Sequence, residues 1–180
     1  RRIWLDLGQF RELIDPHVGA HERWMDHGAG VLLTIARKAG IEFERLSLRQ
    51  MSGWGELRMA FKEIGAAQLC MNARSYNWPM AKQAARIFKD LNPAGKVLLG
   101  GMHSTVAPEE IEGVADIDHI VSGAGEMVFL DLIRDPDAFP RLVAGRSARS
   151  MDDWPHIDRE LWPRPDPRQG SWWPLENPCG

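Results

Sequence analysis

The 180-residue sequence contains only two cysteines, Cys70 and Cys179. Cys70 lies within an apolar run and Cys179 is next to last, so we do not expect a framework of disulfide bonds. A chain of this length can bury a core without covalent links. We therefore expect one ordinary domain with an extension, in a reducing, cytoplasmic environment.

Long apolar runs and clusters of positive charge are also absent. No run approaches the ~20 apolar residues that cross a bilayer, and mixed sequence, not a signal-peptide core, follows Arg1 and Arg2. The net charge is −3, and no basic cluster exceeds that Arg pair. We expect neither a membrane nor a nucleic acid as a partner. Because the chain lacks an initiator methionine, we expect a piece of a longer protein.

Two common phosphate-binding motifs are missing as well. The chain contains neither GxGxxG nor GxxxxGK[ST]. The glycine-containing loop 123–126 ends on Glu126, which would place a carboxylate where a phosphate requires none. We do not expect that loop to hold a nucleotide phosphate.

Apolar strands and helical patterns alternate along the first 135 residues. The repeat of about 25 to 30 residues is typical of βαβ units and predicts an α/β, doubly wound, five-stranded parallel sheet with helices on both faces. The strand at 41–46 is expected at an edge. The predicted strands are 3–7, 41–46, 66–71, 97–99 and 117–121, and the predicted helices are 30–39, 55–64, 79–91, 108–112 and 126–133.

The composition changes beyond residue 135. Six of the twelve prolines and four of the eight tryptophans lie between Trp154 and Pro178. This is too much proline for a regular helix and too many aromatic residues for a free linker. We expect a domain at 1–135 and, at 136–180, an extended strap that lies against an apolar surface.

Glycines follow two predicted strands at the points where they end. Ligands of doubly wound sheets bind at the carboxyl ends of the strands. Gly100, Gly101, Gly123 and Gly125 would let a flat ligand lie directly on backbone at that edge. The alternative is that these are tight turns that need glycine for their own geometry.

Three segments together resemble the N-terminal cobalamin-binding domain of cobalamin-dependent radical SAM enzymes, a flavodoxin-like or Rossmann-like domain. That family shows a strand ending in Gly-Gly-x-His, a Gly-Glu-Gly-Glu loop and a proline-containing strap. Here Ala124 replaces the first glutamate of the loop. The resemblance covers about residues 28–163, and its segments are GGMHSTVAPEEI (100–111), ADIDHIVSGAGEMVFLDLI (115–133) and RSMDDWPHIDRELWPRP (149–165).

The resemblance implies a place for each part of the cofactor cobalamin. The corrin ring would lie over the strand ends, and the nucleotide tail with its dimethylbenzimidazole base would pass between them. The glycines would leave room for that tail. The residues implied as tail contacts are Ser75, Gly100, Gly101, Met102, His103, Gly123, Gly125 and Glu126.

The sequence allows two interpretations of the residue that could ligate cobalt. Methionine-synthase-type cobalamin domains carry Asp-x-His-x-x-Gly, whose histidine ligates cobalt. Asp15 and His17 match its first part, but Gly19 comes one residue early. His17 is therefore either a lower cobalt ligand or a solvated loop histidine. The loop of His103 should face the tail and not the ring, and Cys70 is expected to pack in the core.

The resemblance implies further components for the full-length protein. These are a radical SAM domain with a [4Fe–4S] cluster, S-adenosylmethionine, and a small-molecule substrate methylated at an unactivated carbon. The Cys-x-x-x-Cys-x-x-Cys motif of such clusters is absent from these 180 residues. Two alternatives stay open. One is a cofactor-free scaffold, favoured by Ala124 and the incomplete Asp-x-His motif. The other is a receiver-like signalling domain, which would need an acidic pair where Asp6 stands alone.

Overall fold

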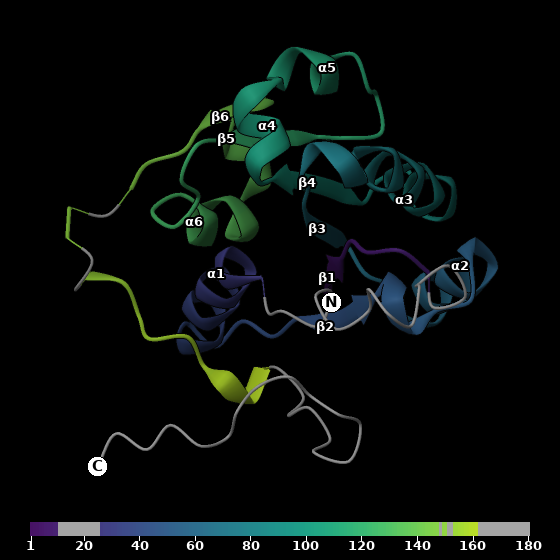
Figure 1. Cartoon of the computed structure of the whole chain (residues 1–180), viewed down its shortest axis with the longest axis horizontal. Helices are drawn as coiled ribbons and strands as arrows, with labels where there is room; N and C mark the ends of the chain where they lie inside the picture. The colour runs from purple at the N-terminus through teal and green to yellow at the C-terminus, as the bar shows by residue number, and fades with distance from the viewer. Residues whose placement is uncertain (11–25, 148, 151–152, 162–180) are drawn as a thin grey trace.

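The structure is a computed structural model that describes residues 1–10, 26–147, 149–150 and 153–161 (Figure 1). Its strands form one sheet in the order β2-β1-β3-β4-β5-β6, and every neighbouring pair is parallel. The doubly wound α/β fold and the edge position of β2 are confirmed. The strands are β1 (Arg2–Asp6), β2 (Glu44–Ser47), β3 (Gln68–Asn72), β4 (Lys96–Gly100), β5 (His119–Ser122) and β6 (Leu142–Ala144).

The sheet has six strands where the sequence predicted five. The additional strand, β6, pairs with β5 at the free edge, with Val143 beside Val121. It has three residues, of which only Val143 is buried. Such a short segment shows no usable alternation. It also lies beyond residue 135, in the part of the chain that the sequence assigned to the strap.

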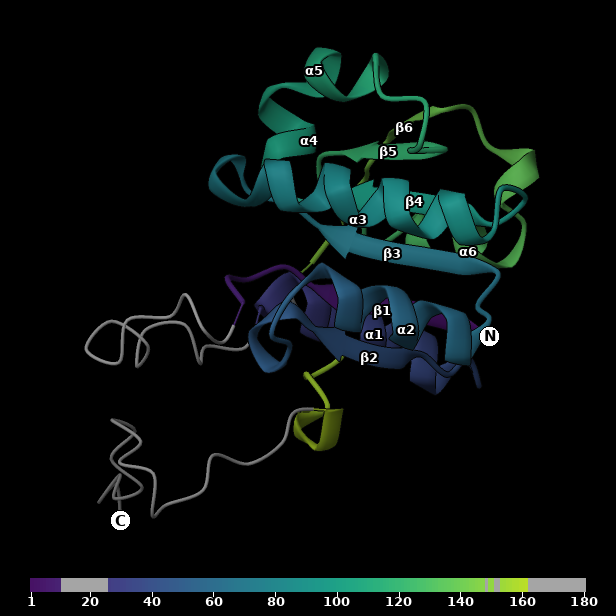
Figure 2. The same ribbon diagram turned by 90° about the vertical axis from the view of Figure 1, so that its right-hand side faces the viewer.

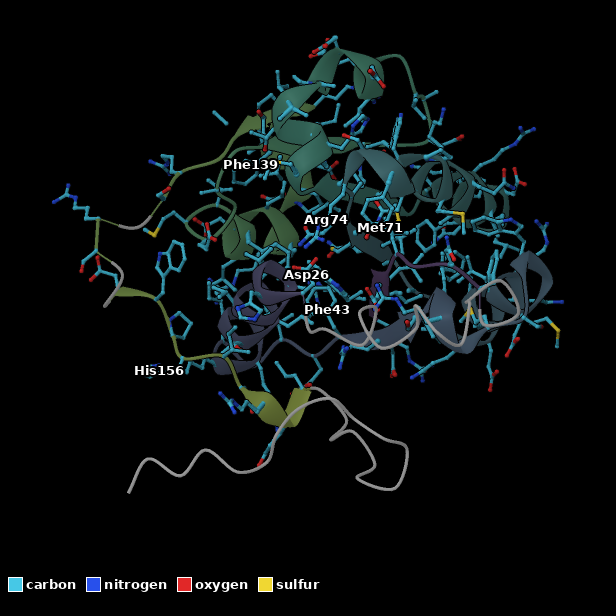
Figure 3. All side chains as sticks on the ribbon, viewed as in Figure 1. Asp26, Phe43, Met71, Arg74, Phe139 and His156 are labelled. Atoms are coloured by element: carbon cyan, nitrogen blue, oxygen red, sulfur yellow. The ribbon has the colours of Figure 1, made fainter. Side chains whose placement is uncertain are left out.

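Helices connect the strands. Helix α1 begins three residues earlier than predicted, because the Asp26 side chain accepts a hydrogen bond from the Ala29 amide (3.1 Å) and caps it (Figure 3). Helix α4 was not predicted. The helices are α1 (His27–Lys38), α2 (Trp54–Ile64), α3 (Trp78–Leu91), α4 (Met102–Val106), α5 (Pro108–Glu112) and α6 (Phe129–Arg134), with 3-10 turns η3 (Leu48–Gln50), η4 (Ser75–Asn77), η5 (Pro136–Ala138) and η7 (Arg159–Leu161).

Helices cover both faces of the sheet (Figures 1 and 2), and a hydrophobic core lies beneath each layer of helices. Strand residues alternate between faces, so Ile3 and Leu5 of β1 join the core beneath α2 and α3. Trp4, between them, joins the core beneath α1 and α6. Helices therefore lie on both faces, and the face with α1 and α6 is the one that carries the candidate site.

The described residues of the strap beyond β6 contact α1 at Ile157 and Asp158. The Asp158 amide donates to Thr34 Oγ1 (2.9 Å), and the Asp158 carboxylate pairs with Arg37 (2.7 Å). Ile157 packs so closely on Gly30 that a Cβ there would lie 2.9 Å from its Cγ2 atom. The strap thus contacts the helix that also borders the candidate site.

Candidate functional site

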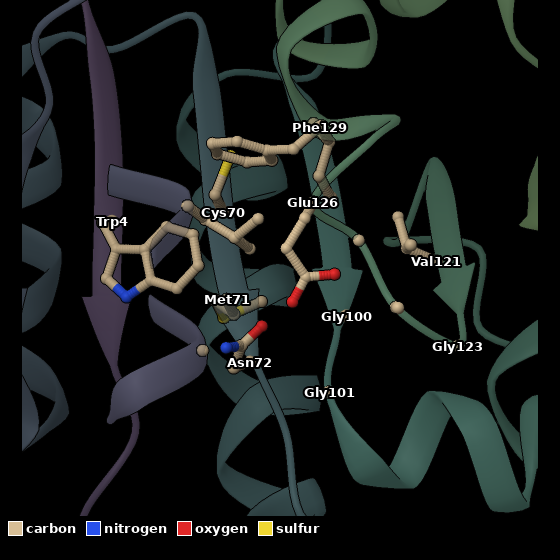
Figure 4. A pocket seen from close by; sticks show the side chains of 15 residues that line it. Trp4, Cys70, Met71, Asn72, Gly100, Gly101, Val121, Gly123, Glu126 and Phe129 are labelled. Carbon is tan, nitrogen blue, oxygen red and sulfur yellow. The ribbon is translucent and has the colours of Figure 1, made fainter. Parts of the chain in front are cut away.

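A cavity of about 150 Å³ opens at the carboxyl edge of the sheet, between α1 and α6 (Figure 4). The last residues of β3 and β4, Asn72 and Gly100, border it. Its remaining lining is Trp4, Gly28, Leu32, Cys70, Met71, Leu98, Gly101, Val121, Gly123, Ala124, Gly125, Glu126 and Phe129.

The position of this cavity follows from the strand order. The chain runs from β1 outward to β2, then crosses back to β3 and continues in the other direction. Helix α1, which follows β1, therefore covers one face of the sheet, and helix α3, which follows β3, covers the other. The loops after β1 and β3 diverge at this point, as in other doubly wound sheets. Trp4 of β1 and Asn72 of β3 line the cavity at this point.

Two glycines keep the cavity open. A Cβ on Gly100 would lie 3.3 Å from Asn72 Oδ1 and 3.9 Å from the Val121 Cβ, both of which belong to the lining. A Cβ on Gly125 would lie 3.8 Å from the Val121 Cγ1 and 3.9 Å from Leu32. Larger side chains at either position would occupy the space between β4, β5 and α1.

Backbone conformation favours glycine at two other positions that line the cavity. Gly101 has φ = +101° and Gly123 has φ = +91°, values that residues with a side chain rarely adopt. A Cβ on Gly101 would also lie 2.6 Å from the Ala73 carbonyl oxygen. The tight-turn explanation therefore applies to Gly101 and Gly123. Gly100 and Gly125 border the cavity, and their role in making room for a ligand stays a prediction.

The cavity contains few polar groups. The Glu126 carboxyl and the Asn72 amide both face into it (Figure 4). Cys70 contributes a thiol, and burial raises its pKa to about 12. That group is therefore neutral at physiological pH and acts here as an apolar wall.

The structure brings five of the eight predicted tail-contact residues together at the cavity: Gly100, Gly101, Gly123, Gly125 and Glu126. The other three, Ser75, Met102 and His103, do not line it. His103 is buried, with Nδ1 3.3 Å from Ser75 Oγ and Nε2 3.6 Å from a Glu110 oxygen. Met102 is 63% exposed on α4.

His17 lies outside the described residues, so its role as a cobalt ligand stays a prediction. Among the described residues, no three His, Cys, Asp or Glu side chains are grouped so as to hold a metal ion. Within the same part of the chain, no helix has the length and apolar character to cross a membrane.

Sequence reasoning did not select several lining residues. Asn72 had a usable signal, because it is the first polar residue after the apolar run of β3. Trp4 and Phe129 had none, since large apolar residues in a strand and a helix look like core. Both are indeed almost fully buried, and only their place beside the cavity distinguishes them.

Comparisons with known proteins do not assign the chain to a family. No family model matches the chain, and no curated protein matches it. Among solved structures, it is similar to the N-terminal domain of the hypothetical protein TM0182 from Thermotoga maritima, with 17% identity and a TM-score of 0.46. That match covers 77% of this chain and 98% of the other.

Proposed function

We propose that this chain binds a corrinoid, and that the cavity takes the base at the end of the nucleotide tail. The observation that supports this most is the cavity at the carboxyl ends of β3, β4 and β5. Gly100 and Gly125 border it with bare backbone instead of side chains. An opening between strand ends, next to the change of strand order, is what a tail entering from that edge requires.

The size of the cavity limits what can enter. A volume of about 150 Å³ suits a single small ring system and is below the ~300–1,000 Å³ of pockets that enclose whole ligands. The corrin ring would therefore lie outside, over the strand ends. Exposed apolar side chains follow β3, β4 and β5 on that edge and suit a large flat ligand. They are Tyr76, Met102, Val106 and Met127, which are 54–65% exposed.

The role of this chain's residues would be to hold, orient and shield the cofactor. When bound, a corrinoid supplies methyl-transfer chemistry. For the full-length protein we propose a radical SAM domain with a [4Fe–4S] cluster, which uses S-adenosylmethionine to methylate an unactivated carbon of a small molecule. None of these further parts lies within the described residues.

Titration of the purified chain with hydroxocobalamin tests the proposal. We expect a shift in the visible absorbance of the corrinoid and its coelution with the protein on gel filtration. An unchanged spectrum together with corrinoid eluting only in the small-molecule volume would contradict the proposal.

A cofactor-free scaffold is the second candidate, and two observations favour it. Backbone geometry alone explains the glycines at 101 and 123. The strap also makes specific contacts with α1 through Thr34 and Arg37, as an interdomain connection would. A cofactor-free scaffold predicts that hydroxocobalamin keeps an unchanged spectrum and elutes apart from the protein.

A further inference from the structure

One buried oxygen in the cavity lacks a hydrogen-bond donor. Glu126 Oε2 is fully shielded from solvent and has no hydrogen-bond partner among the described residues. The surrounding walls are mostly apolar, with Trp4, Leu98 and Phe129 among them. A buried carboxyl oxygen without a partner is costly. A ligand that donates a hydrogen bond to Glu126 would remove that cost.

The Asn72 amide offers a second contact in the same cavity. Its Oδ1 atom would lie 3.3 Å from a Cβ on Gly100, and its Nδ2 atom would lie 3.4 Å from a Cβ on Gly28. The amide therefore occupies the space between these two glycines. Within the described part of the chain, no hydrogen bond to its side chain is found, so both its donor and its acceptor can serve a ligand.

We infer that the cavity selects an aromatic nitrogen base with an exocyclic amine, of which adenine is the simplest example. The amine would donate to Glu126 Oε2. Asn72 would pair with the ring nitrogen and amine, as amide side chains do with adenine. The flat ring would pack against Trp4 and Phe129. Dimethylbenzimidazole has no amine and would leave Glu126 Oε2 without a donor.

Such a base has two possible sources. It is either the lower base of a corrinoid, in which case the inference rests on the proposed function, or part of a free adenine nucleoside. Four probes distinguish them: a corrinoid with adenine as its lower base, cobalamin, a corrinoid that lacks the base, and adenosine.

We expect the adenine corrinoid to bind at least tenfold more tightly than cobalamin, since the hydrogen bond to Glu126 alone has an effect of about that size. In Glu126→Met, which keeps a side chain of similar length, this preference should fall about tenfold. Glu109→Met, on the exposed surface of α5, is the matched control and should keep it. Thermal unfolding of each variant shows whether the domain remains folded.

The outcomes separate the two proposals. If cobalamin binds as tightly as the adenine corrinoid, the inference is overturned while the proposed function stands. If adenosine binds and no corrinoid does, the inference stands for nucleosides and the proposed function fails. If Glu126→Met is folded and keeps the preference, the role of Glu126 is overturned. If no probe binds, both proposals are overturned.

Discussion

The imidazole ring of His103 packs against the indole ring of Trp78, with ring centroids 5.0 Å apart and planes inclined by 35°. Trp78 belongs to the core beneath α2 and α3, on the sheet face opposite to the cavity. His103 thus fixes α4 to the start of α3 and does not point at the site. These contacts favour a structural role, whereas the tail contact expected from the sequence stays a prediction.

His103→Ala should therefore reduce the free energy of unfolding and leave the affinity for a corrinoid unchanged. The ring is 3% exposed, and its removal leaves a void beside Trp78, so we expect a loss of about 2–4 kcal/mol in the free energy of unfolding. Urea denaturation measures this. Met102→Ala, at the exposed neighbouring position, is the control and should cost less than about 0.5 kcal/mol. A folded His103→Ala protein with strongly weakened corrinoid binding would contradict this assignment.

Gly101→Ala should be among the most destabilising glycine substitutions. It combines a positive φ with a Cβ 2.6 Å from the Ala73 carbonyl oxygen, and we expect a cost of about 3 kcal/mol or more. Gly65 has φ = +59° at the end of α2 and open space around it. Gly65→Ala should therefore cost only about 1–2 kcal/mol. Equal losses in thermal or urea unfolding would show that the contact with Ala73 is unimportant.

The Cys70 thiol should resist alkylation. Burial raises its pKa to about 12, and only the thiolate reacts. In a Cys179→Ser background at pH 8, we expect iodoacetamide to react with the native protein about a thousandfold more slowly than with the urea-unfolded chain. Comparable rates would show that Cys70 is accessible and ionised.

The same raised pKa predicts a dependence of stability on pH. The pKa in the folded state, about 12, lies above the 9.0 of the same thiol in an unfolded chain. The contribution of the buried Cys70 thiol to the free energy of unfolding is therefore complete below pH 9 and is lost as pH rises towards 12. Relative to Cys70→Val, which does not titrate, the wild type should lose stability over that range. A constant difference in free energy of unfolding between the two proteins would contradict this prediction.

Thr34→Val should weaken the contact between the strap at Asp158 and α1. Thr34 Oγ1 accepts the Asp158 amide hydrogen at 2.9 Å, and valine keeps the shape without the acceptor. We expect the Asp158 amide to exchange hydrogen about fivefold faster, the equivalent of about 1 kcal/mol. Thr105→Val is a matched control, since Thr105 Oγ1 accepts the Gly123 amide hydrogen in the same way elsewhere. Unchanged exchange at Asp158 in Thr34→Val would show that the hydrogen bond does not hold the strap.

The sequence was sufficient for most of the fold, because alternation and glycine positions are local signals. The β3 run around Cys70 and the helical spacing of α3 are examples. Strand β6 has too few residues to produce such a signal. The early start of α1 depended on a cap by Asp26 that periodicity does not detect.

The site was only partly predictable. Gly100 and Gly101 are adjacent and identical in sequence, yet one opens the cavity and the other is required by the backbone. That difference depends on φ and on neighbours from other strands. The same holds for Trp4, which borders the cavity only because β1 pairs with β3. Such relationships are set by the order of the strands and not by local pattern.

The most direct test of the central claim is the affinity of hydroxocobalamin for the wild type, Gly100→Leu and Gly55→Leu, measured by absorbance titration. A leucine at 100 would enter the cavity, whereas Gly55 lies on α2 with open space around it. We predict that Gly100→Leu weakens binding by tenfold or more, about 1.4 kcal/mol, and that Gly55→Leu binds as the wild type does. Equal affinity of all three folded proteins, or no binding by any, would contradict a corrinoid tail in this cavity.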